Sequence, residues 1–363
     1  METTVIKIGT SILRGNTKYV TGNIIDVFCK YIAEYINKGN KVIIVSSGSV
    51  GLGCGKLEIK ERPIEVVALQ AVAAVGQGYL MSLYESSMKK YGINVGQILL
   101  TRSELGNRRS YLSASSTLKK LLDWNVVPIV NENDTISSEE LKYGDNDTLS
   151  ALVACAVSSK QLILLTDIES LYSSDPKIDK AAKPIFDIHN PTDLNKFNNT
   201  SNVKSNWGTG GIKTKLQAAK IATERGIKVH LSDGRDPKNL EKILCGMRVG
   251  TVFHPSLSPI KNRKSWLANA LKPLGSITLD DGAKKAVLKN GASLLLVGIM
   301  KVEGEFDSNN SVKLLDTNSL EIGIGISSLS SLEIRKSLNN RLLSKKSPVV
   351  IHRDVLTLST GLS

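Results

Sequence analysis

Short carboxylates, amides and lysines gather where apolar runs of the chain end. NEND (131–134) directly follows the run VVPIV, and GDND (144–147) comes shortly after it. Lys7 is the one cation in the run TVIKI (4–8), and GTGGIKTK (208–215) places two lysines beside a glycine turn. Lysines and backbone N–H groups bind phosphate oxygens, and carboxylates bind Mg²⁺, so these residues together indicate phosphoryl transfer.

Each of these lysines needs a negative charge nearby or access to water. Burial of an unpaired ammonium is costly, so Lys7 must face an anion such as a phosphate or extend its head to solvent. Lys213 and Lys215 lie in the first turn of a predicted helix, where cations oppose the helix dipole, and this favours an anionic ligand there. SSGSVGLG (46–53) fits an anion-binding turn and an ordinary tight turn equally well.

Nucleophilic triads and metal centres have little support in the sequence. None of the four histidines (His189, His230, His254, His352) follows a predicted strand at a glycine turn, and His230 is expected to be packed within its strand. The four cysteines form no CxxC pair, and no two histidines have metal-ligand spacing. We therefore predict no protein-held metal, and thiols that are reduced and mostly buried.

Six apolar, β-branched runs are predicted to be strands, with helices between them. Near-continuous apolar strands that alternate with helices indicate an α/β fold, with a mostly parallel sheet sandwiched by helices. Ligands bind where the strands of such a sheet end, which is where the polar residues lie. The predicted strands are 4–8, 41–47, 93–100, 126–130, 161–166 and 228–232, and the predicted helices are 22–37, 63–90, 109–123, 146–158, 211–225 and 237–244.

Two segments of this α/β domain stand out by composition. ALQAVAA (68–74), within the helix over 63–90, is apolar nearly all round, so that helix is expected either in the core or against a second subunit. NKFNNTSNVKSNWG (195–208) is polar and short of apolar residues, which predicts a mobile segment.

The pattern changes after about residue 255, where we place the end of the α/β domain (1–255). A basic linker (256–273) leads to short alternating runs, which predict a small β-rich domain over 274–352 and a C-terminal tail over 353–363. The runs are GSITLD, ASLLLVGI, SVKLLD and SPVVIHRD.

The net charge of +13 is spread over both parts of the chain. Lys and Arg outnumber Asp and Glu by 32 to 25 in residues 1–250 and by 15 to 9 in residues 251–363. The C-terminal part is thus more basic per residue, which leaves nucleic-acid binding open. The N-terminus has no basic segment followed by an apolar one, and no apolar run approaches about 18 residues, so we expect a cytoplasmic protein without a membrane segment.

Many sequence blocks in the same order make the chain similar to a known family. It resembles the glutamate 5-kinases (γ-glutamyl kinases) of the amino-acid kinase superfamily over nearly its whole length, and residues 274–352 resemble a PUA domain. The resemblance implies an amino-acid kinase fold and ATP-dependent phosphorylation of the side-chain carboxylate of L-glutamate to L-glutamyl 5-phosphate, the first step of proline synthesis. The blocks are VIKIGTS, VIIVSSGSVGLG, LQAVAAVGQ, GINVGQILLTR, VPIVNENDTI, KYGDNDTLSALVA, LLLTDIESLY, GTGGIKTKLQAA and GTVFHP followed by NRKSW.

The resemblance also implies roles for individual residues. Lys7 and Lys215 would contact the transferring phosphoryl group, and Asp147 would orient both lysines. Mg²⁺ would be carried by the ATP phosphates, and TISSEELKYG (135–144) would be a flap over the substrate. The implied glutamate-binding positions are Ser47, Gly48, Asp134 and Asn146. The glycine turns with Gly9, Thr10, Gly48 and Ser49 would surround the transferring phosphoryl group. The implied ATP-binding positions are Lys7, Gly9, Thr10, Thr166, Asp167, Thr209, Gly210, Gly211, Ile212, Lys213, Thr214 and Lys215.

Two other functions stay open at this point. A sibling specificity of the same superfamily would phosphorylate acetylglutamate, aspartate, carbamate or UMP instead. Alternatively, the basic PUA-like domain would bind RNA, although aromatic residues make up only 5% of the chain, which disfavours base stacking. The resemblance further implies inhibition by proline at a site overlapping that of glutamate, a homodimer or homotetramer, and glutamate-5-semialdehyde dehydrogenase as functional partner.

Overall fold

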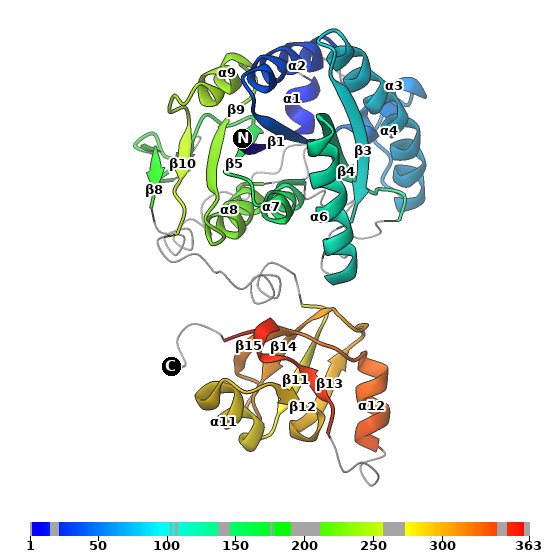
Figure 1. Cartoon of the computed structure of the whole chain (residues 1–363), viewed down its shortest axis with the longest axis vertical. Coiled ribbons are helices and arrows are strands. Elements are labelled where there is room, and N and C mark those ends of the chain that lie inside the picture. The colour runs from blue at the N-terminus through cyan, green and yellow to red at the C-terminus, as the bar shows by residue number, and fades with distance from the viewer. Residues whose placement is uncertain are drawn as a thin grey trace. The chain divides into compact units, whose positions relative to one another are not determined.

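The computed structural model describes residues 2–14, 22–101, 104–105, 108–136, 146–174, 176, 178–189, 211–256, 273–339 and 347–358. The chain forms two compact units (Figure 1), one of Met1–Thr101 with Leu112–Pro259 and one of Arg102–Tyr111 with Ile260–Ser363. The predicted linker, the predicted mobile segment 195–208 and most of the predicted flap lie outside the described residues.

An eight-stranded sheet in the order β3-β4-β2-β1-β5-β9-β10-β8 forms the N-terminal unit. All neighbouring strands in it are parallel except β9 and β10, so the predicted α/β fold with a mostly parallel sheet is confirmed. The strands are β1 (Thr3–Ile8), β2 (Lys41–Ser46), β3 (Asn94–Leu100), β4 (Val126–Glu132), β5 (Gln161–Thr166), β8 (Asp187–Ile188), β9 (Lys228–Asp233) and β10 (Thr251–Phe253). A separate small pair is formed by β6 (Leu171–Tyr172) and β7 (Pro184–Ile185).

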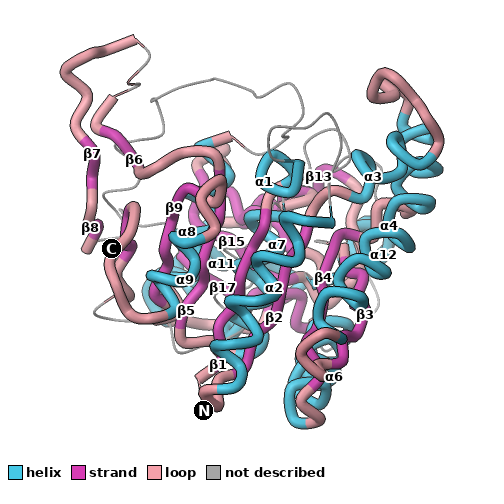
Figure 2. Tube along the Cα trace, turned by 90° about the horizontal axis from the view of Figure 1, so that it is seen from above, coloured by secondary structure: helices cyan, strands magenta, loops and turns pink. Residues whose placement is uncertain are grey.

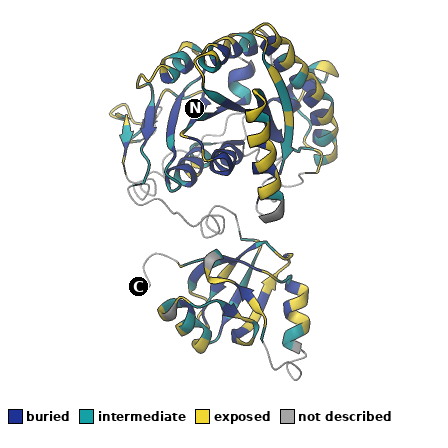
Figure 3. Cartoon of the chain, viewed as in Figure 1, coloured by how far each residue is buried: buried dark blue, intermediate teal, exposed yellow. Residues whose placement is uncertain are grey.

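Helices cover both faces of this sheet, as Figures 1 and 2 show. Alternation along β1 explains the two layers, because successive side chains of a strand point to opposite faces. Ile6 and Ile8 belong to a core formed with α1 (Thr10–Arg14), α2 (Gly22–Asn37), α4 (Val66–Lys89) and α9 (Lys238–Leu244). Lys7 faces the other way, toward α7 (Asn146–Val157), which is buried along its whole length (Figure 3). Among the described residues, this unit also contains α3 (Ser49–Lys56), α6 (Arg108–Asp123) and α8 (Ile212–Thr223).

Helices α3 and α4 approach each other closely enough that only glycine fits at two contacts. A Cβ at Gly76 would lie 1.7 Å from the carbonyl oxygen of Ser49, and a Cβ at Gly53 would lie 1.9 Å from that of Val72. Both distances are far below van der Waals contact. This backbone contact holds Ser49, the first residue of α3, against α4.

Helix α4 is buried on one face only, so it is not a fully enclosed core helix, and its contact with a second subunit stays a prediction. Val67 is 65% exposed and Tyr79 is 41% exposed, whereas Leu80 and Tyr84 are fully buried. By length and composition α4 could cross a membrane, but core helices of soluble proteins meet the same two conditions. Its buried face packs against α2 and α3.

The C-terminal unit holds a five-stranded sheet in the order β13-β11-β14-β15-β17 and the pair β12-β16, around its own apolar core. Two helices in it were not predicted: α11 (Asp281–Asn290), capped by Asp280 and ended by the left-handed Gly291, and α12 (Ser331–Asn339). ASLLLVGI is not one strand, because a 3-10 turn at Leu296–Gly298 separates β12 from β13. The strands are β11 (Gly275–Leu279), β12 (Leu294–Leu295), β13 (Ile299–Gly304), β14 (Ser311–Leu315), β15 (Glu321–Ile326), β16 (Val349–Ile351) and β17 (Leu356–Leu358).

Candidate active site

Two lysines and one aspartate from distant parts of the chain form a buried cluster at the end of β1. Lys7 Nζ lies 2.5 Å from Asp147 Oδ1, and Lys215 Nζ lies 3.2 Å from Asp147 Oδ2. Thr214 Oγ1 donates a hydrogen bond of 2.7 Å to the same Oδ2. Asp147 is 1% exposed and the two lysines 7% and 6%, so water contributes little to the solvation of their charges.

The electrostatics of this cluster favour an additional anion. Burial alone would raise the pKa of Asp147, but the ammonium groups of Lys215 and Lys7 outweigh it and hold that pKa well below its ordinary value. Asp147 is therefore ionised at neutral pH, and these three side chains carry one net positive charge. A phosphoryl group placed beside the two ammonium groups would compensate that charge.

The topology of the sheet explains why the cluster forms at β1. The chain passes from β1 to β2 on one side and later places β5 on the other, so β1 lies where the strand order reverses. Ligands of open parallel sheets bind at such points. Gly9 lies beside Lys7, since a Cβ there would be in van der Waals contact with Lys7 Nζ at 3.4 Å, and Thr10 begins α1 directly after it.

The turn after β2 also depends on a glycine. Gly48 caps the start of α3 with φ of 105° and ψ of 0°, a left-handed conformation that glycine adopts without strain. Ser47, just before it, is half-buried, and its backbone N–H donates to the carbonyl oxygen of Ile8. The turn thus holds Ser47 beside the end of β1.

A chain of buried amides connects α7 to α4 through β4. Asn146 Nδ2 lies 2.7 Å from Ser47 Oγ, 3.1 Å from the Ser46 carbonyl oxygen and 3.0 Å from Asn131 Oδ1. Asn131 Nδ2 in turn donates to Gln77 Oε1 at 2.8 Å. With its amide nitrogen so engaged, Asn146 leaves its buried Oδ1 without a partner among the described residues. The site therefore presents an acceptor for a donor group of a ligand.

Gln77 and Asn131 had no predicted role. Gln77 is 9% exposed and Asn131 is 1% exposed, and both help to fix the orientation of Asn146. The one signal for Gln77 is a polar amide at the end of the apolar block LQAVAAVGQ. For Asn131 the one signal in the sequence is its place in the polar block NEND.

Asp134 follows β4 in the chain, and its side chain contacts Ser49, the first residue of α3. Its Oδ2 accepts a hydrogen bond of 2.7 Å from Ser49 Oγ. Burial raises the pKa of Asp134 above its ordinary value, against the opposing effect of this hydrogen bond. A cationic group of a ligand would stabilise the ionised carboxylate, so Asp134 is suited to bind an ammonium.

The predicted nucleotide residues lie at the end of β5 and the start of α8. Thr166 is 4% exposed, its Oγ1 donates to Asp167 Oδ1 at 3.1 Å, and its carbonyl accepts from the Gly234 N–H at 2.8 Å. Gly211 caps α8 without a side-chain hydrogen bond.

The residues of the α8 start differ in their surroundings. Thr214 and Lys215 face Asp147, whereas Lys213 is exposed. The two lysines, for which the sequence predicts the same anionic ligand, therefore have different surroundings. Ile212 is half-buried and begins the helix. Thr209 and Gly210 lie outside the described residues.

Comparisons with known proteins agree with this architecture. Residues 2–233 match the amino acid kinase family. The chain belongs to the amino acid kinase family. Residues 275–346 of this amino acid kinase match the PUA domain, which fits the position of the C-terminal unit.

Relatives of similar length cover almost all of the kinase. It is 61% identical over 360 residues to a glutamate 5-kinase of Prochlorococcus marinus strain NATL2A, covering 99% of this chain and 100% of that protein. It is 60% identical to the glutamate 5-kinase of Prochlorococcus marinus strain SARG, with 98% of both chains covered, and 52% identical to that of Synechococcus sp. strain CC9605, again with 98% of both.

Proposed function

We propose that the chain transfers the γ-phosphoryl group of ATP to the side-chain carboxylate of L-glutamate, giving L-glutamyl 5-phosphate, the first step of proline biosynthesis. The observation that carries this proposal is the match at 60% identity, over 98% of both chains, to a protein named glutamate 5-kinase. A kinase of the same superfamily with another acceptor would not be expected to be so similar over the whole chain. The geometry of the site supports the chemistry independently.

The Lys7–Asp147–Lys215 cluster suits transfer between two anions. A side-chain carboxylate is already ionised at neutral pH, so the acceptor needs no general base. The protein has to align two negatively charged groups and compensate the charge of the transition state. Lys7 and Lys215 supply that charge, and Asp147 holds both ammonium groups in place through its two oxygens.

The amide chain and Asp134 suit the α-ammonium and carboxylates of glutamate. Asn146 Oδ1 and the Asp134 carboxylate are acceptors for the ammonium, and the Ser47 hydroxyl is a donor for a carboxylate. Gln77 and Asn131 hold the Asn146 amide in the orientation that presents Oδ1. We assign these residues to the glutamate side of the site.

Gly9, Thr10, Thr166 and Asp167 surround the ends of β1 and β5 and are assigned to ATP, together with the loop from Thr209 to Lys215. The start of α8 adds backbone N–H groups without a capping side chain, which suits phosphate oxygens.

The described residues of this site fit a Mg²⁺ ion that is held by the nucleotide. Both oxygens of Asp147 are engaged by Lys7, Lys215 and Thr214, and Asp134 accepts from Ser49. Mg²⁺ commonly binds through substrate phosphates and water with few protein ligands. When bound, it would supply further compensation of phosphate charge.

The proposal is tested by offering the full chain Mg-ATP with L-glutamate, aspartate or N-acetylglutamate and trapping any acyl phosphate with hydroxylamine. We expect hydroxamate with L-glutamate in clear excess over the other two acceptors. Hydroxamate with aspartate or N-acetylglutamate but none with L-glutamate would overturn the assignment of the substrate.

We also infer that proline inhibits by competing for the glutamate site, since it shares the α-carboxylate and the positively charged nitrogen but lacks the side-chain carboxylate. Inhibition should be relieved by excess glutamate. Rates that do not change at saturating proline would refute this inference.

We further infer a homodimer or homotetramer in the cytoplasm, with the exposed face of α4 around Val67 and Tyr79 as a contact between copies. Glutamate-5-semialdehyde dehydrogenase would consume the reactive product. Light scattering that gives a monomer mass at micromolar concentration would contradict the oligomer.

A further inference from the structure

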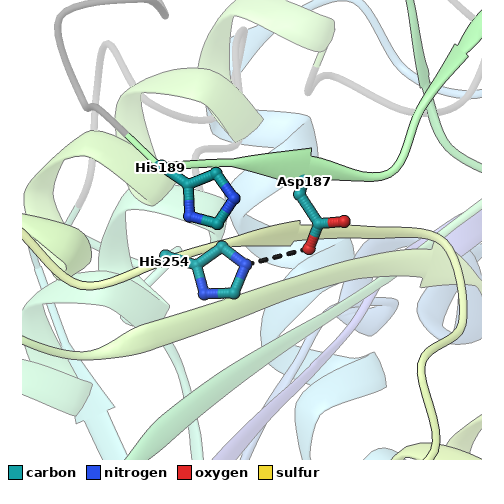
Figure 4. A group of neighbouring side chains, drawn as sticks. All are labelled: Asp187, His189 and His254. Atoms are coloured by element: carbon teal, nitrogen blue, oxygen red, sulfur yellow. Dashed lines mark hydrogen bonds and ion pairs between the residues drawn. The ribbon is translucent and has the colours of Figure 1, made fainter.

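A carboxylate and two imidazoles meet at the edge of the N-terminal sheet, outside the Asp147 cluster (Figure 4). Asp187 begins β8 and His189 follows that strand, so both side chains lie on one face of it. His254 follows β10, which pairs in parallel with β8 in the register Phe253↔Ile188, and this brings His254 beside His189. The metal-binding atoms of the three side chains all lie within 4.8 Å of one another.

We propose that Asp187, His189 and His254 bind one divalent transition-metal ion of the zinc class. Two imidazole nitrogens and one carboxylate oxygen are a ligand set that suits Zn²⁺, whereas Mg²⁺ and Ca²⁺ prefer oxygen ligands alone. Three protein ligands leave a fourth position for water. None of the three residues belongs to the proposed catalytic or substrate-binding groups, so this inference does not depend on the proposed function.

Arg248 orients the Asp187 carboxylate by binding the oxygen that does not contact His254. Arg248 Nη1 donates to Asp187 Oδ2 at 2.8 Å, while Asp187 Oδ1 lies 2.9 Å from His254 Nε2. Arg248 also stacks on the Phe186 ring, 5.2 Å from its centroid, which keeps the guanidinium on the Oδ2 side. An outer partner that fixes a ligating carboxylate is a regular feature of metal sites. Oδ1 remains the oxygen that faces the imidazoles.

Metal binding requires a movement of His189. The two imidazole rings stack with centroids 4.2 Å apart and planes 15° from parallel, and an ion cannot lie in both ring planes at once. Ligand atoms around a tetrahedral Zn²⁺ lie roughly 3.3–3.6 Å apart, given metal–ligand distances of about 2.0–2.2 Å, so Asp187 Oδ1 and His254 Nε2, which lie 2.9 Å apart, must also separate slightly to admit the ion. His189 is exposed and can rotate, whereas His254 is half-buried. His189 is therefore the ligand that closes the site.

The expected effect of the ion is to fasten β8 to β10. β8 is an edge strand of two residues, and β10 is its only neighbour in the described part of the sheet. An ion bound by side chains of both strands binds the native state alone, and so it stabilises that state by mass action.

The experiment uses the full-length chain with Cys245→Ser, because Cys245 is an exposed free thiol that would bind the same ions. After treatment with a chelator, the protein is titrated with Co²⁺, followed by its visible absorption, and with Zn²⁺ in competition with a chromogenic chelator. Three variants on this background are compared: His189→Ala, His254→Ala and, as a matched control in the other unit, His352→Ala.

We expect one equivalent of each ion, an affinity at least about 100-fold lower in the His189→Ala protein, and unchanged binding in the His352→Ala control. Zn²⁺ should raise the melting temperature of the parent and of the His352→Ala protein but not of the His189→Ala protein. His189 is exposed, so its removal leaves the fold intact and the comparison interpretable. Absence of stoichiometric binding, or equal affinity in the His189→Ala and His352→Ala proteins, would overturn the proposal.

Discussion

Replacing Asp147 by Asn tests the buried cluster most sharply, because it removes one charge and almost no volume. The substitution leaves Lys7 and Lys215, which are 7% and 6% exposed, beside an uncharged amide. Loss of one partner of a buried ion pair costs about 3–5 kcal/mol, since the remaining charge stays poorly solvated. Domains are stable by about 5–15 kcal/mol, so the loss is a large fraction of the total.

The pH dependence of this effect follows from the pKa of Asp147. Burial raises that pKa and the ammonium groups of Lys215 and Lys7 lower it by more, so it lies below the unfolded value of about 4. Its contribution to the free energy of unfolding is therefore complete above about pH 4 and is lost as the pH falls through the folded pKa. The variant should show its full defect at pH 7 and a smaller one in strong acid.

The assay is urea unfolding of the full chain at pH 7, followed by circular dichroism. Asp123→Asn is the matched control, because Asp123 pairs with Lys41 at 2.9 Å on the surface, where Asp123 is 63% exposed. Surface pairs contribute at most about 1 kcal/mol, so this control should shift the unfolding midpoint only slightly. Adding Lys7→Met to Asp147→Asn removes one uncompensated charge and should restore part of the stability. An Asp147→Asn protein as stable as the Asp123→Asn control would refute the reasoning.

Three further predictions concern other residues of the site. Lys7→Ala should lower kcat by at least about 100-fold with little change in the KM for glutamate. Lys213 is exposed, so Lys213→Ala should lower kcat much less. Equal losses of kcat in the two variants would contradict the distinction between these lysines. Burial raises the pKa of Asp134, so the KM for glutamate should increase as the pH is lowered toward that pKa. The Asp134→Asn variant should not show this increase. The same increase in the variant would exclude Asp134 as its source. Gly76→Ala should destabilise the protein by about 1–3 kcal/mol or more and raise the KM for glutamate. The new methyl group would lie 1.7 Å from the carbonyl oxygen of Ser49 and would displace the start of α3. An unchanged melting temperature would contradict the close backbone contact.

The sheet and its covering helices could be predicted because the hydrophobic pattern along the chain is set by burial on both faces. The strand over 4–8 and the helix over 22–37 agree with β1 and α2 nearly residue for residue. The cost of burying an ammonium predicts either an anion beside Lys7 or access of its head to solvent, and the structure shows the former, with Asp147 as the anion. Local chemistry of this kind leaves a trace in the sequence.

Features that depend on the approach of distant segments could not be predicted. Gln77 reaches Asn131 only because α4 packs over the end of β4, and nothing in LQAVAAVGQ specifies that contact. His189 and His254 meet only through the pairing of β8 with β10, so spacing along the chain does not reveal them. By contrast, the sequence does carry signals for α11, namely Asp280 as its cap and Gly291 at its end, but the alternating runs on both sides of this helix predict strands.

The measurement that tests the central claim most directly follows the oxygen atoms of the acceptor. L-Glutamate labelled with ¹⁸O in its side-chain carboxylate is incubated with the enzyme and Mg-ATP. In L-glutamyl 5-phosphate the bridging oxygen comes from that carboxylate, and attack of the α-amine on the acyl carbon expels phosphate that keeps this oxygen. Transfer to the side-chain carboxylate therefore predicts one ¹⁸O in each phosphate released. Phosphate without ¹⁸O, formed at the same rate, would show that water is the acceptor and would contradict the proposed reaction.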